Sequence, residues 1–86
     1  MNINKLIAIV KNKLEKEIVI EGLKIEDKSF LHKNHKGHQE GKFHLKLTIK
    51  SDELAKLSKI VSTKRIYNVI QAELKEHIHS IQILLN

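Results

Sequence analysis

The chain begins with aliphatic residues that have the spacing of an amphipathic helix. Apolar side chains recur every three or four positions, with lysines and asparagines between them. Asn2 or Asn4 can cap the first turn. The residues with this spacing are Ile3, Leu6, Ile7, Val10 and Leu14. We therefore expect a first helix with one apolar face directed to a core.

Two later segments alternate between apolar and polar residues, which is the pattern of a half-buried strand. The first covers residues 23–26, after an apolar run at residues 18–20. The second covers residues 42–50, and its polar face includes His44, which we expect at the surface. Its apolar face consists of Phe43, Leu45, Leu47 and Ile49. The two strands are expected to form a hairpin with the histidine-rich segment between them as its long connection.

Helical spacing returns after the second strand. Ser51 and Asp52 provide an N-cap and an acidic first turn, and a short break is expected around residues 58–63. A further helix then ends near His77. The apolar positions with this spacing are Leu54, Leu57, Ile60, Val61, Ile66, Val69, Ile70 and Leu74.

The C-terminal segment HIHSIQILLN is rich in branched residues and predicts a third strand, in which His79 shares a face with Ile81 and Ile83. The helical connection before it favours a parallel, right-handed pairing with the second strand. We expect one α+β domain over residues 1–86, with the order helix-strand-strand-helix-strand. It should have a small mixed sheet of three strands with the helices on one face.

Composition restricts the chemistry. The chain has no cysteine, so by itself it forms neither a disulfide nor a thiolate metal site. Its formal net charge of +6 rests on lysines and the single arginine, Arg65, which predicts loose attraction to polyanions without base recognition. No apolar run approaches the roughly 20 residues that span a bilayer, and no secretory signal is evident. We expect a cytoplasmic protein with no membrane contact.

Four of the six histidines lie in the stretch HKNHKGHQEGKFH. Imidazole is a common metal ligand that titrates near neutral pH, so His32, His35 and His38 are candidate metal ligands or pH sensors. The alternative is a solvated hairpin loop that binds zinc or nickel only adventitiously. For His79, the alternative is a partly buried histidine that is hydrogen-bonded to backbone.

An ordered set of short motifs over nearly the whole chain resembles the BolA family. The motifs are Asp27-Lys28-Ser29, a histidine-containing loop, His44-Leu45-Lys46-Leu47 leading into Ser51-Asp52, Ile66-Tyr67, and Ile78-His79-Ser80-Ile81. The resemblance implies a fold related to the type II KH domain and a partnership with monothiol glutaredoxins that carry a Cys-Gly-Phe-Ser motif. In such pairs a bridging 2Fe-2S cluster is held by the glutaredoxin cysteine, by glutathione, and by histidine or cysteine of the BolA partner.

The resemblance also implies which residues act as ligands. His79 matches the C-terminal ligand position of the family, and His32 matches the loop ligand, with His35 or His38 in its place if the loop register differs. Imidazole can replace thiolate on one iron, so a chain without cysteine can complete a cluster but cannot hold one alone. We expect a monomer in isolation, a heterodimer with the glutaredoxin, and no enzymatic activity.

The alternative function is nucleic-acid binding, because some BolA-like proteins are described as transcriptional regulators. A basic KH-like surface would use Lys59, Lys64 and Arg65. However, KH modules bind phosphates with a Gly-x-x-Gly loop between helices, and KLSKIVSTK contains no glycine. The family's Arg-His-Arg triplet is also replaced here by residues 62–64, which weakens the basic patch. No nucleophile elbow, phosphate loop or paired-carboxylate pocket supports an enzyme.

Overall fold

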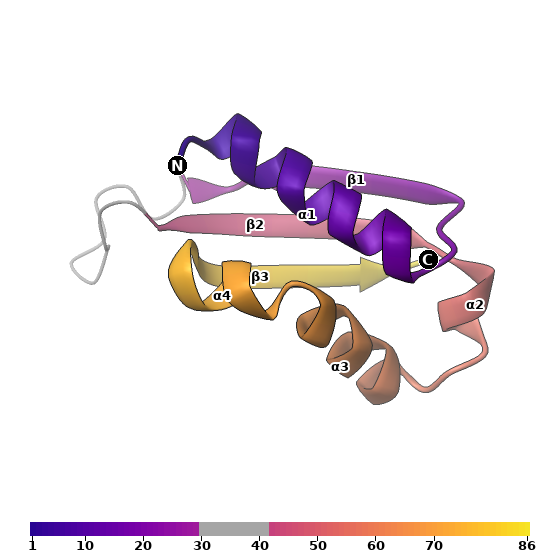
Figure 1. Ribbon diagram of the computed structural model, residues 1–86. Coiled ribbons are helices and arrows are strands. Elements are labelled where there is room, and N and C mark those ends of the chain that lie inside the picture. The colour runs from indigo at the N-terminus through magenta and orange to yellow at the C-terminus, as the bar shows by residue number, and fades with distance from the viewer. Residues whose placement is uncertain (30–41) are drawn as a thin grey trace.

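The computed structural model of the protein describes residues 1–29 and 42–86. The elements of this part of the chain are α1 (Ile3–Glu17), β1 (Gly22–Asp27), β2 (Phe43–Lys50), α2 (Asp52–Ala55), α3 (Lys59–Val69), α4 (Gln71–Glu76) and β3 (Ile78–Leu85). Helices α1, α3 and α4 lie on one face of the sheet (Figure 1). This arrangement confirms the predicted α+β class. Within the two described ranges, no helix has the length and apolar character needed to cross a membrane.

The sheet has the strand order β1-β2-β3. Strands β1 and β2 are antiparallel, with Ile25 opposite Leu47, as expected for a hairpin. Strands β2 and β3 are parallel, with Leu47 opposite Ile83, because the intervening helices carry the chain back to the starting end of β2. Both pairings confirm the sequence prediction and bring the start of β3 next to the start of β2.

The core lies between the helices and one face of the sheet. In α1, the side chains of Leu6, Val10 and Leu14 are spaced four residues apart and are fully buried. Asn2 caps this helix, since its Oδ1 accepts a hydrogen bond from the backbone N–H of Lys5 at 2.8 Å. The apolar face of β2 supplies three more buried residues, Leu45, Leu47 and Ile49.

The helical region is divided differently from the prediction. The first break lies at residues 56–58, where the Ser58 side chain accepts a hydrogen bond from Val61 N–H and starts α3. A second break, at Ile70, separates α3 from α4. The restart at Ser58 changes which residues face the core, so Ile60 and Val61 are exposed although their spacing predicted an apolar face.

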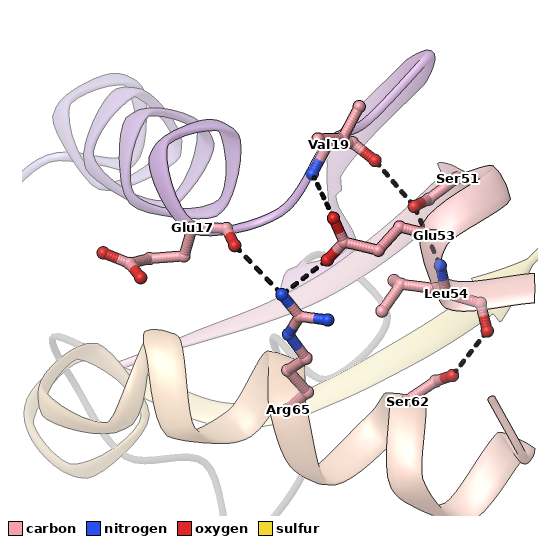
Figure 2. Close-up of polar contacts among 7 residues, drawn as sticks. All are labelled: Glu17, Val19, Ser51, Glu53, Leu54, Ser62 and Arg65. Carbon is pink, nitrogen blue, oxygen red and sulfur yellow. Dashed lines mark hydrogen bonds and ion pairs between the residues drawn. The ribbon is translucent and has the colours of Figure 1, made fainter. Parts of the chain in front are cut away.

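Buried serines connect these short helices to the rest of the fold. Ser51 Oγ donates a hydrogen bond to the carbonyl of Val19 at 2.7 Å and accepts one from Leu54 N–H at 3.1 Å (Figure 2). Ser62 Oγ donates to the Leu54 carbonyl at 3.0 Å. Because these side chains are almost completely buried, their bonds fix α2 between the α1–β1 connection and α3.

Candidate metal-ligand site

The position of His79 is set by an irregular pairing between β2 and β3. Phe43 is opposite Ile78, but the next pair is His44 and Ser80, so the register shifts by one residue. His79 therefore has no opposite residue on β2. Ile78 is buried in the core, whereas His79 is exposed. An extra residue of this kind changes the direction of the side chains that follow it.

This register shift corrects the prediction for His79. Ile81 and Ile83 are partly buried against the core, as expected, but His79 does not share their environment. The strict alternation that placed all three residues on one face is interrupted between His79 and Ile81. The alternative of a partly buried histidine that is hydrogen-bonded to backbone is also wrong, because the residue is exposed.

His44 is buried, which contradicts its expected place at the surface. Only 5% of the residue is exposed, although it belongs to the polar face of β2. Its Nδ1 lies 2.6 Å from Ser80 Oγ, and its ring centroid lies 4.9 Å from that of His79, with the two planes 59° apart. Its backbone N–H donates to Ser29 Oγ at 3.1 Å, and its carbonyl accepts from Lys28 N–H at 2.7 Å.

The sequence motifs included both His44 and Ser80, but the contact between them was not predicted. It depends on the register between two strands that are separated by three helices. Alternation along a strand shows which residues share a face, and it does not show which residue of the neighbouring strand lies opposite. The sequence motifs therefore identified His44 and Ser80 but did not predict the contact between them.

The donor set of this site is incomplete for a metal held by the chain alone. The described residues contain no group of three or more His, Cys, Asp or Glu side chains that could hold a metal ion. They do contain an exposed imidazole, His79, in contact with a buried one, His44. Such a set fits a cluster whose sulfur ligands come from another molecule. His32, His35 and His38 lie outside the described residues, so their predicted roles stay predictions.

Three lysines surround a glutamate on the sheet face near this histidine pair. Glu26 Oε1 lies 3.6 Å from Lys24 Nζ and 3.7 Å from Lys28 Nζ, and Lys46 is opposite Glu26 in the sheet. Burial raises the pKa of the Glu26 carboxyl, but the three lysines together outweigh this effect, so its pKa lies below the ordinary value. The carboxylate is therefore held in its charged form.

The residues of the nucleic-acid alternative lie on α3. Lys59 and Lys64 are exposed there. Arg65 instead forms an ion pair with Glu53 and donates a hydrogen bond to the carbonyl of Glu17 at 3.2 Å (Figure 2). Its guanidinium thus joins α1, α2 and α3. A contact between Arg65 and a phosphate would compete with this intramolecular role.

Comparison with known proteins identifies the family. A family model described as "BolA-like protein" matches residues 14–86. The chain belongs to the BolA-like family. This BolA-like chain is 31% identical over 77 residues to the DNA-binding transcriptional regulator BolA of Haemophilus influenzae, an alignment that covers 90% of the chain and 72% of that protein.

A second relative is a much longer protein. The BolA-like chain is 32% identical over 80 residues to SufE-like protein 1, chloroplastic/mitochondrial, of Arabidopsis thaliana. The match covers 87% of the chain but 22% of the relative, so the chain spans about a fifth of that protein. The similarity therefore concerns one part of that relative.

Solved structures agree with this assignment. The BolA domain of SufE1 from Arabidopsis thaliana superposes with a TM-score of 0.77 at 30% identity, covering 100% of the BolA-like chain and 93% of that domain. BolA1 from the same plant gives a TM-score of 0.78 at 26% identity, with 92% and 87% covered. The resemblance seen in the sequence motifs is thus confirmed for family and fold.

Proposed function

We propose that this BolA-like chain binds a monothiol glutaredoxin of the Cys-Gly-Phe-Ser type and completes the coordination of a bridging 2Fe-2S cluster through His79. It would act in iron-sulfur cluster trafficking or in iron and redox regulation. The observation that carries the proposal is the exposed imidazole of His79, which lies at the register shift of β3 against the buried ring of His44. The missing cysteines require the sulfur ligands to come from the glutaredoxin and glutathione.

The surroundings of His79 support a ligand role. Ligands perform best on rigid elements whose neighbours restrict their orientation. His79 belongs to a strand, and the ring beside it is held by the 2.6 Å contact between His44 and Ser80. When bound, the cluster supplies the redox-active iron. The chain contributes an imidazole nitrogen, which must be deprotonated to coordinate, so acid would oppose binding.

The test is reconstitution of the heterodimer under anaerobic conditions. The chain is mixed with a monothiol glutaredoxin, glutathione, iron and sulfide, and visible absorption and circular dichroism spectra are recorded. We expect His79→Ala to change the visible spectra and to lose cluster faster than the wild type. His77→Ala is the matched control, because it removes the same side chain two residues away. If the His79→Ala spectra equal those of the wild type, His79 is not a ligand.

The second ligand is tested separately. His32 is our first choice, followed by His35 and His38, and each is replaced by alanine in the same reconstitution. The variant whose spectra depart from wild type identifies the ligand. If none does, none of these three histidines serves as a ligand.

Nucleic-acid binding remains the second candidate, favoured by the name of the Haemophilus relative as a DNA-binding transcriptional regulator. Lys59 and Lys64 are exposed for such a role, whereas Arg65 is engaged with Glu53. Binding through lysines alone should be weak, insensitive to sequence and steeply dependent on salt. A sequence-specific footprint that resists salt would favour this candidate over the glutaredoxin partnership.

Three further expectations stay predictions. They are a cytoplasmic location, a monomeric state of the isolated chain, and the absence of enzymatic activity.

A further inference from the structure

A pocket lined by five polar and two apolar residues lies beside the histidine pair, between β2 and β3. Its volume is about 330 Å³. The polar residues that line it are Lys28, His44, Lys46, Ser80 and Gln82. In β2 these residues alternate with the core residues, so they belong to the sheet face opposite the helices. Leu45 and Ile81 complete the lining, and the pocket lies beside the proposed ligand, His79, because His44 lines the pocket and contacts His79.

Among the residues that the structure describes, positive charges outnumber negative ones around this pocket. Lys24 and Lys28 share a single carboxylate oxygen of Glu26, and Lys46 faces the same residue across the sheet. Among the described residues, three ammonium groups thus lie around the carboxylate of Glu26. Within residues 1–29 and 42–86, Lys46 makes no ion pair shorter than 4 Å. Adding one more anion here would reduce repulsion among the lysines.

We propose that this pocket binds a carboxylate group of a small anionic ligand held beside His79, with Lys46 as its main cationic contact. The inference rests on the proposed function, because glutathione is the ligand that a glutaredoxin would hold there. Gln82 provides a hydrogen-bond donor next to the ammonium group, and the Ser80 hydroxyl provides a second one when its oxygen accepts the Nδ1–H of His44. A lysine ammonium and two neutral donors match the charge and the two oxygens of a carboxylate.

The lining favours a carboxylate over a phosphate. Phosphate sites commonly use backbone N–H groups from a helix N-terminus or a glycine-rich loop. The lining residues come from β2, β3 and Lys28, and no described helix contributes to the pocket. The backbone N–H of Lys28 is already donated to the His44 carbonyl at 2.7 Å. The remaining donors are side chains, which suit a smaller and less charged group.

The experiment uses the isolated, isotope-labelled chain without iron or glutaredoxin. Reduced glutathione is titrated in, and proton–nitrogen correlation spectra report the affected residues. We expect saturable shifts centred on Lys46, Ser80 and Gln82. Lys46→Gln should weaken binding about fivefold, as expected for one partly exposed charge pair. Lys50→Gln is the matched control, because Lys50 lies on the same face of β2 at its other end, and it should weaken binding less than about twofold.

Two other ligands test whether the pocket recognises a carboxylate. The diethyl ester of glutathione lacks free carboxylates and should produce no saturable shifts. Inorganic phosphate should bind more weakly than glutathione. The inference is overturned if the ester binds as well as glutathione, if phosphate binds more tightly, or if both lysine variants weaken binding equally. Shifts at residues remote from the pocket, or none at all, also overturn it. These results are independent of the cluster spectra of His79→Ala, so each proposal can fail alone.

Discussion

Replacing Ser51 with alanine tests how α2 is fixed to the rest of the domain. Ser51 is 3% exposed. Its hydroxyl accepts a hydrogen bond from Leu54 N–H, which caps α2, and donates one to the carbonyl of Val19, which holds the connection between α1 and β1 (Figure 2). Alanine removes both bonds at once.

The magnitude follows from the two bonds. Losing a helix N-cap typically costs about 1 kcal/mol. Losing the second bond, to Val19, adds about 1 kcal/mol. We therefore expect Ser51→Ala to lower the free energy of unfolding by about 2 kcal/mol. In a domain of this size each kcal/mol lowers Tm by about 4–8 °C, so the expected decrease is about 8–16 °C.

Urea unfolding followed by far-ultraviolet circular dichroism measures this difference. Ser58→Ala is the matched control, because Ser58 caps α3 through Val61 N–H at 3.2 Å while the residue itself is exposed. Only the cap is lost there, so about 1 kcal/mol is expected. If Ser51→Ala costs no more than Ser58→Ala, the bond to Val19 contributes nothing and the reasoning is refuted.

Two further substitutions test the core and the charged sheet face. On α3, Ile66 is 0% exposed and Ile60 is 69% exposed, so Ile66→Ala should cost about 2–5 kcal/mol and Ile60→Ala less than about 0.5 kcal/mol in the same unfolding assay. Equal costs would contradict the observed restart of the helix. Despite the opposing effect of burial, the neighbouring lysines hold the pKa of the Glu26 carboxyl below its ordinary value. Its stabilisation is present above the unfolded-state pKa and is lost as the pH falls through the lower folded-state value. The urea midpoints of the wild type and of Glu26→Gln should therefore differ near neutral pH and converge in acid. A difference between these midpoints that does not change with pH would exclude a role for the carboxylate charge.

Much of the fold was predictable because its periodic patterns are strong. Leu45, Leu47 and Ile49 alternate without interruption, and all three are buried in β2. The parallel pairing of β2 with β3 followed from the helical connection between them. The helix boundaries were less accurate, because the cap at Ser58 competes with an apolar spacing that continues through Ile60.

The site was harder to predict than the fold. The exposure of His79 depends on a one-residue register shift, and the contacts of the buried His44 with Ser80 and His79 depend on the same strand pairing. Both are properties of paired strands, and neither is encoded in the periodicity of a single strand. The family motifs nevertheless identified His79 as a residue of interest, because they rely on residue identity at ordered positions.

The parallel pairing of β2 with β3 also affects when the histidine pair can form during folding. His44 and Ser80 are 36 residues apart, and their contact requires the helices between them to be in place. Contacts between residues so far apart in sequence close a large loop and are slow to form. A molecule that has detached β3 retains His44 on the hairpin but loses its contacts with His79 and Ser80. Amide hydrogen exchange along β3 would therefore report the opening of the histidine pair.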